Sequence, residues 1–235
     1  MINSILLNWD LLIVGAIVIL TVILGFVVFL ENSHSKMHQS FLYFTLFTAL
    51  WGIFNYANNR VDDVAFAFLF LRLTIFFVCW QTASLLFFSL TFPDKELTIP
   101  RYLRIGLMSL TLVVSILTLT PLVFVKVGAI SASGHIEYAV LGPAMPLFGI
   151  MTIGFLITGS IILIRRIRRL DLEQRQAYHL IVYGLIIMFV LIVTSNFLIP
   201  VLLYDISFTP FGAIFVFPFI GLTGFAIIKK KVFNV

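Results

Sequence analysis

The amino-acid sequence predicts an all-α integral membrane protein: a bundle of seven transmembrane helices with a short extracellular β-hairpin between the fourth and fifth spans. Of its 235 residues, 61% are hydrophobic and 11% are charged, and the mean hydropathy is +1.15. Soluble domains are roughly half apolar and about a quarter charged, so this composition excludes an ordinary soluble protein. Two further observations support the class. The apolar residues gather in long runs, and the basic residues gather on one side of those runs.

A helix needs about 20 consecutive apolar residues to cross the hydrocarbon core of a bilayer. Seven runs approach or exceed that length: Leu11–Leu30, Phe41–Ala57, Val64–Phe92, Tyr102–Val123, Pro143–Ile164, Ala177–Ile199 and Phe208–Ile228. No positive charge precedes the first run, and no small-residue cleavage site follows it, so we expect a span and not a signal peptide. The third run is long for one crossing. We expect it to tilt or to extend beyond the membrane until Pro93 ends it.

The orientation follows from the positions of the basic residues. Twelve Lys and Arg flank the runs on one side, two (Arg60 and Lys126) lie on the other, and Arg72 lies within a run. Cytoplasmic loops carry the excess of Lys and Arg. We therefore expect a multi-pass protein of the cell (inner) membrane, with the N-terminus outside and the C-terminus in the cytoplasm. Because topology explains the net charge of +5, a nucleic-acid partner is not expected.

The longest connection is the outer segment between the fourth and fifth spans. Two β-type stretches, Val123–Ile130 and His135–Leu141, flank the turn-forming residues Ser131–Gly134. This pattern predicts a short hairpin.

Polar residues in the outer half of the bundle define a candidate ligand pocket. Arg72 is an ionisable group inside a span, which costs about 2.5–3.5 kcal/mol on insertion scales and marks a functional candidate. Helical spacing places Trp51, Asn55 and Asn58 on one face of the second span. The remaining candidates are Asn196, at the outer end of the sixth span, and Asp205, in the last outer loop.

Each of these features has a simpler structural explanation. Arg72 can snorkel outward along its own helix instead of binding an acidic partner or an anionic ligand. The amides can form interhelical hydrogen bonds. The basic cytoplasmic loop contains Arg165, Arg166, Arg168 and Arg169. It can fix the topology and attract anionic lipid, or it can dock an acidic partner.

The sequence shows no constellation typical of an enzyme. The seven runs contain no Asp or Glu, and no phosphate-binding loop or metalloprotease motif is present. His34 and His38 have i, i+4 spacing, but no third ligand is evident, so we expect solvated loop residues. Cys79 lies in an apolar run and is expected to be a packed thiol. We thus expect no catalytic residue, no metal and no cofactor.

Several motifs in order resemble the N-terminal seven-transmembrane region of bacterial and archaeal sensor histidine kinases. They are Ala49-Leu50-Trp51-Gly52, Leu71-Arg72-Leu73, Leu90-Thr91-Phe92-Pro93, Gly142-Pro143, Glu173-Gln174-Arg175-Gln176, Asn196-Phe197-Leu198-Ile199-Pro200 and Ala226-Ile227-Ile228. The likeness covers essentially the whole chain. It implies one sensor-like domain over residues 1–235, in which the seventh span connects to cytoplasmic output domains.

The resemblance implies a sensory input module that transmits an outer stimulus to the cytoplasm and works as a homodimer. The sequence departs from the family pattern because it ends at Val235, with no phosphoacceptor helix or ATP-binding segment. We therefore expect an excised sensor region or a receptor-like protein that acts through a separate cytoplasmic signalling protein or membrane complex. The alternative is a non-signalling scaffold or anchor subunit. A small transporter is disfavoured because no span carries a carboxylate.

Overall fold

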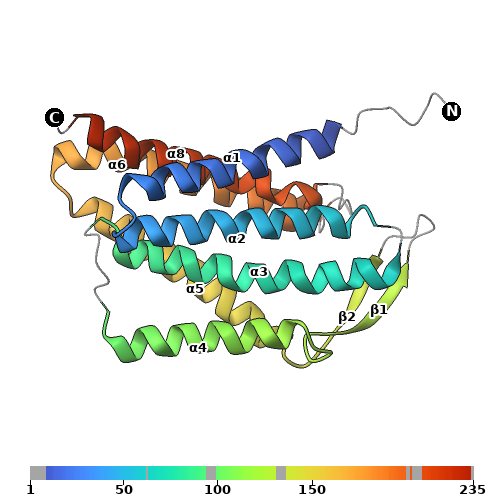
Figure 1. Cartoon of the computed structure of the whole chain (residues 1–235). Helices are drawn as coiled ribbons and strands as arrows, with labels where there is room; N and C mark the ends of the chain where they lie inside the picture. The colour runs from blue at the N-terminus through green and yellow to red at the C-terminus, as the bar shows by residue number, and fades with distance from the viewer. Residues whose placement is uncertain are drawn as a thin grey trace.

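The computed structural model describes residues 9–61, 63–93, 99–130, 136–199, 202 and 208–233, with the backbone alone at 128–130, 136–138, 173–174, 176–177, 196–197 and 229–233. The described residues form a bundle of seven α-helices (Figure 1). The helices are α1 (Trp9–Glu31), α2 (Lys36–Asn58), α3 (Val64–Thr91), α4 (Arg101–Thr118), α5 (Met145–Arg168), α6 (Leu172–Val193) and α8 (Gly212–Phe233). A π-helical turn, η1 (Thr194–Leu198), continues α6, and a 3-10 turn, η2 (Thr209–Phe211), precedes α8. The predicted all-α class is confirmed.

Helix α3 shows how local sequence sets the helix ends. The Asp63 carboxylate caps its first turn by accepting hydrogen bonds from the backbone N–H groups of Ala65 and Phe66, at 2.8 and 3.0 Å. The helix ends at Thr91, two residues before Pro93. Its 28 residues span about 42 Å, which is longer than the roughly 30 Å hydrocarbon core. The third helix is therefore as long as its apolar run predicts.

Apolar length alone identifies five of the helices as spans. They are α1, α3, α4, α5 and the segment Thr209–Ile228, while the apolar part of α6 is the shorter Tyr178–Val193. Helix α2 is less apolar because it carries buried polar side chains, among them Thr45, Thr48 and Asn55. It packs against α1, α3 and α8, so those side chains lie inside the bundle.

The distribution of polarity is inverted relative to a soluble protein. Large apolar side chains cover the outside, as at Leu30 and Ile150, each 74% exposed. Buried hydroxyls line the inside, and Thr45, Ser89, Thr111 and many others donate to a backbone carbonyl three or four residues earlier. Contiguous apolar surface on this scale requires a lipid solvent. The exposed belt therefore supports a membrane location.

Aromatic and aliphatic side chains fill the space where α2, α3, α5, α6 and α8 meet. Phe41, Phe88, Phe92 and Phe219 are all fully buried there. A second cluster joins α3, α4 and α5 and includes Cys79, which is a packed thiol as expected. His38, by contrast, is only 6% exposed, so the expected solvated position is wrong for this residue. It lies in the first turn of α2, whose register turns it inward.

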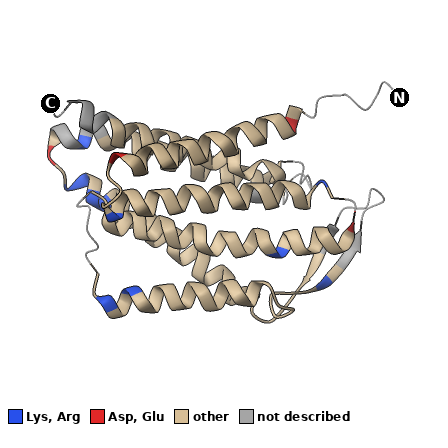
Figure 2. Ribbon diagram, viewed as in Figure 1, with Lys and Arg blue, Asp and Glu red and all other residues tan. Residues whose placement is uncertain are grey.

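The two ends of the bundle differ in charge (Figure 2). We call one the basic end, where α2, α4 and α6 begin and α1, α3, α5 and α8 finish. The basic residues at this end whose side chains the structure describes are Lys36, Arg101, Arg104, Arg165, Arg166, Arg168, Arg169 and Arg175. We call the other the hairpin end, and its described basic residues outside the helices are Arg60 and Lys126. Arg60 forms an ion pair there with Asp10 of α1.

A two-stranded antiparallel hairpin lies at the hairpin end, as the sequence predicts. It consists of β1 (Phe124–Ile130) and β2 (Ile136–Leu141), with Phe124 opposite Leu141 and Val127 opposite Ala139. The expected turn residues Ser131–Gly134 lie outside the described residues.

Candidate functional site

Two candidate residues of α2 contact the beginning of α8. Asn55 is buried, and its side-chain Nδ2 donates to the backbone carbonyl of Thr209 in η2 at 2.7 Å. One turn earlier, the indole ring of Trp51 lies directly against Gly212, where a Cβ atom would overlap it. A buried amide and a close-packed ring therefore join the hairpin-end half of α2 to the start of α8.

Asn58, one turn beyond Asn55, has a side-chain oxygen that is buried. Among the described residues, that Oδ1 atom has no hydrogen-bond partner. The neighbouring Asn59 donates from Nδ2 to the backbone carbonyl of Asn55 at 2.8 Å. An unpaired buried acceptor costs about 1–3 kcal/mol, which makes Asn58 a candidate acceptor for a ligand donor.

Arg72 contacts the hairpin. Its Nη2 donates to the backbone carbonyl of Phe124, the first residue of β1, at 2.7 Å. Its guanidinium carbon lies 4.4 Å from the ring centroid of Phe68, so the cation also stacks on an aromatic face. The side chain of Arg72 therefore ties β1 to α3. No carboxylate of the described residues pairs with it.

The structure thus divides the predicted pocket. Trp51 and Asn55 of α2 contact the start of α8, Asn58 follows one turn further along α2, and Arg72 on α3 contacts β1. The backbone of Asn196 lies in the π-helical turn η1, a feature that often marks functional sites, and its side chain lies outside what the structure describes. Asp205 lies outside the described residues. A pocket shared by all six residues stays a prediction.

Replacing Arg72 with alanine is expected to release β1 from α3. The lost hydrogen bond to a charged donor contributes about 1.5–3 kcal/mol locally, while removal of a cation from the span recovers about 2.5–3.5 kcal/mol of insertion cost. Amide hydrogen exchange of Phe124 and Val125 should therefore rise at least tenfold, with little change in the melting temperature of the bundle. Arg72→Lys is the control because it keeps the charge. If the amides of β1 exchange at the same rate in Arg72→Ala as in the unsubstituted chain, Arg72 does not hold β1 against α3.

A buried hydrogen bond between α2 and α3 was not predicted. Gln81 Nε2 donates to Thr48 Oγ1 at 2.9 Å, and that hydroxyl donates in turn to the backbone carbonyl of Phe44 at 2.7 Å. A lone glutamine within an apolar run is the sequence signal that could have suggested it. The register of the two helices, which decides the partner, is not readable from either helix alone.

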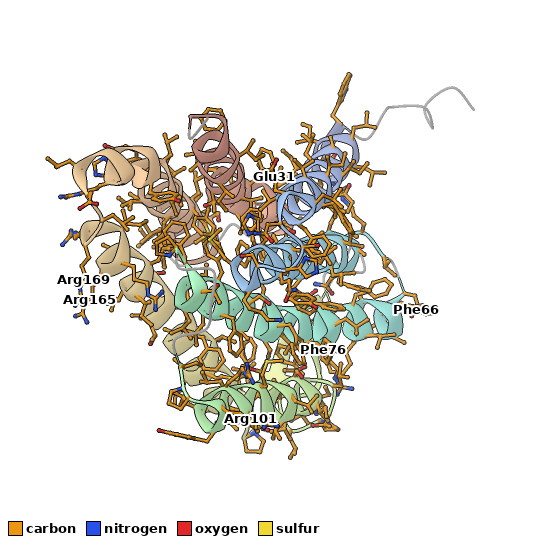
Figure 3. All side chains as sticks on the ribbon, turned by 60° about the vertical axis from the view of Figure 1, so that its left-hand side comes forward. Glu31, Phe66, Phe76, Arg101, Arg165 and Arg169 are labelled. Carbon is orange, nitrogen blue, oxygen red and sulfur yellow. The ribbon has the colours of Figure 1, made fainter. Side chains whose placement is uncertain are left out.

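The basic loop has a divided role. Arg166 Nη1 donates to the backbone carbonyl of Phe92 at 2.6 Å, which satisfies a carbonyl just beyond α3. Ile167 is buried in the core, while Arg165, Arg168 and Arg169 are exposed at the end of α5. Figure 3 shows Arg165 and Arg169 projecting away from the bundle. Three of the four arginines are therefore available to lipid headgroups or to a partner.

A cavity of about 460 Å³ opens beside α3 at the basic end, between α2 and α4. We call it the basic-end groove. Its wall is mostly aromatic and aliphatic, and its two basic residues are Lys36 and Arg104. None of the six predicted pocket residues lines it. Ser84 of α3 lies at its floor and is 7% exposed.

Comparison with known proteins adds one match. The model of a family described as the N-terminal 7TM region of histidine kinase matches residues 13–235. No curated protein and no solved structure matches the chain. The match covers all seven helices except the first residues of α1.

Proposed function

The chain belongs to the family of N-terminal seven-transmembrane regions of histidine kinases, and from this membership we propose that it senses a stimulus at the hairpin end and transmits it to the cytoplasm. The family implies a sensory input module in a membrane. The side on which the stimulus arrives and the path of the signal are parts of our proposal.

The orientation of the proposed module rests on charge. Eight basic residues whose side chains the structure describes lie at the basic end, against Arg60 and Lys126 outside the helices at the hairpin end, and positive residues favour the cytoplasmic side. The hairpin end then faces outward, and α8 runs from the outer side to the cytoplasm. In this arrangement α8 is the output helix, and the exposed arginines of the α5 end face the same compartment as its last turn.

The contact between Asn55 and Thr209 carries the proposal. It joins the face of α2 that holds three pocket candidates to the segment from which α8 starts. A ligand that binds unequally to two arrangements of this junction would shift α8 relative to α2, which is the requirement for coupling two sites. We further propose that the module acts as a homodimer with a cytoplasmic signalling protein or domain.

The test joins the chain at Val235 to the dimerisation and ATP-binding part of a histidine kinase, with zero to three residues inserted at the junction. Autophosphorylation is measured in proteoliposomes. Asn55→Leu should change the output about fivefold or more, the lower bound of typical coupling energies. Ile53→Leu, on the exposed side of α2, is the matched control and should stay within about twofold. If Asn55→Leu matches the unsubstituted chimera at every insertion length, the input role is contradicted. A scaffold subunit predicts that result.

A further inference from the structure

The basic-end groove is built by three helices that do not close around it. Helix α2 and helix α4 both pack on α3, and each contributes one face to the groove. From α2 come Lys36, Tyr43 and Phe47, from α3 come Trp80 and Ser84, and from α4 comes Arg104. The groove opens between α2 and α4, where Tyr43 is 54% exposed and Ile105 52% exposed.

The small side chains Ala83 and Ser84 explain why the groove is hollow. Both are buried on α3 beneath the opening, at 2% and 7% exposure. The first turns of α4 form one side of the groove, and the residues from Arg101 to Gly106 are all exposed, so no other described part of the protein covers that side. In a membrane, these exposed apolar surfaces face hydrocarbon. An occupant must therefore enter from the bilayer.

The length of the groove matches one leaflet. Lys36 is the first residue of α2, and Phe47 lies eleven residues further along the helix. At 1.5 Å per residue this separation is about 16 Å, close to half of the roughly 30 Å hydrocarbon core. The apolar wall continues inward to Trp80, whose ring stacks on Phe47 with centroids 5.7 Å apart. One acyl chain of a lipid in the basic-end leaflet has this reach.

The mouth of the groove is positive. Lys36 and Arg104 lie in the first turns of α2 and α4, so two helix N-termini and two cations face the same level of the membrane. The Lys36 ammonium donates to Gln39 Oε1 at 3.0 Å, and Gln39 donates to the Ser33 carbonyl at 2.8 Å. Two of the three ammonium donors remain available. No described carboxylate forms an ion pair with either cation.

From these features we propose that the groove binds one anionic glycerophospholipid. Its phosphate lies between Lys36 and Arg104, and one acyl chain lies along Tyr43, Phe47 and Trp80 toward the floor at Ser84. The volume lies in the range of about 300–1,000 Å³ that is usual for ligand sites. The site is separate from the α2–η2–α8 junction, so it does not depend on the proposed sensory function.

The primary test is native mass spectrometry of the purified chain titrated with phosphatidylglycerol or with phosphatidylcholine. The unsubstituted chain should retain one phosphatidylglycerol in preference to phosphatidylcholine. Lys36→Ala with Arg104→Ala should weaken retention roughly twenty-five-fold, the product of about fivefold for each charge near the surface. The matched control is Arg101→Ala with Arg168→Ala, which removes the same charge at the same end but outside the groove. If both double variants lose phosphatidylglycerol retention equally, the lipid is attracted by the overall positive charge of this end and not by the groove, and the proposal is overturned.

A second measurement locates the acyl chain. Lipids brominated at mid-chain quench tryptophan fluorescence on contact, and Trp80 lines the groove. At equal mole fraction, brominated phosphatidylglycerol should quench the unsubstituted chain more than brominated phosphatidylcholine does. Ser109→Phe fills the groove from an exposed position on α4 and should remove this difference without unfolding the protein. Equal quenching by both lipids in the unsubstituted chain, or competition by water-soluble glycerol phosphate, would overturn the proposal.

Discussion

Replacing Gly142 with alanine is expected to open the base of the β-hairpin and to destabilise the protein by about 1–3 kcal/mol, the usual range for overpacking. A Cβ atom at this position would overlap the backbone carbonyl of Leu122 and lie 2.7 Å from the backbone oxygen of Pro121. Backbone atoms cannot rotate away as a flexible side chain can. The two strands would have to separate.

The separation would break specific hydrogen bonds. The backbone N–H of Gly142 donates to the Val123 carbonyl and that of Ala144 donates to the Leu122 carbonyl, both at 2.8 Å. Hydrogen exchange should therefore accelerate at both amides, and the denaturant midpoint in detergent should fall. Gly106→Ala is the matched control, because Gly106 lies in α4 with open space around it. It should be neutral or stabilising by up to about 1 kcal/mol, since alanine is the better helix former. If Gly142→Ala and Gly106→Ala change hydrogen exchange and the denaturant midpoint equally, the overlap at Gly142 is not the cause of the effect.

The hairpin illustrates what sequence predicts well. Local patterns are enough to place β1 and β2 within one residue of the expected stretches, because alternation and turn residues are properties of the segment itself. The helices follow for the same reason. Their ends shift where a local signal was missed: α4 ends at Thr118, before Pro121, and α5 continues through the basic residues to Arg168. Positive side chains in a last turn interact favourably with the helix dipole.

The contacts of the candidate residues depend on helix register and could not be predicted. The sequence allows Arg72 either to snorkel outward or to bind a partner in the bundle, and in the structure its partner is the carbonyl of Phe124, 52 positions away in the sequence. Asn55 likewise reaches Thr209, 154 positions away. Helical spacing tells which residues share one face of a helix. It does not tell which other helix covers that face, and that choice depends on side-chain fit across the whole bundle.

The basic-end groove was missed for a related reason. Its floor consists of small residues, and in the sequence its two cations, Lys36 and Arg104, indicate only the membrane topology. Ser84 and Trp80 lie one turn apart on α3, but the hollow above them exists only because α2 and α4 pack on α3 on either side of these residues. A cavity is a property of the packing of several helices, so a single sequence gives little sign of it.

Replacing Gly184 with leucine is expected to force α6 and α8 apart and to lower stability by about 1–3 kcal/mol or more. A Cβ atom on Gly184 would lie 2.9 Å from the Cα atom of Phe219 and 3.0 Å from the backbone oxygen of Pro218. Phe219 is fully buried, so the surrounding side chains prevent it from moving away from the added atoms. Helices in a bilayer associate through close packing of small residues because lipid gives them no hydrophobic driving force. The close approach at Gly184 therefore contributes to the packing of α6 against α8.

The measurement is the midpoint of unfolding by sodium dodecyl sulfate in mixed micelles, together with the output of the kinase chimera. Gly154→Leu is the matched control, since Gly154 lies in α5 with nothing near its missing Cβ. It should leave the midpoint unchanged.

Because α8 is the proposed output helix, Gly184→Leu should also shift autophosphorylation at temperatures where the bundle remains folded. Gly184→Ala is the smaller change, because its single added carbon lies 2.9 Å from the Cα atom of Phe219 and requires a shift of α6 against α8 without adding further side-chain volume. Stability close to the unsubstituted chain, combined with a changed output, would show that the position of α8 against α6 sets the signal. Equal midpoints for Gly184→Leu and Gly154→Leu would instead show that this close approach does not hold the helices together.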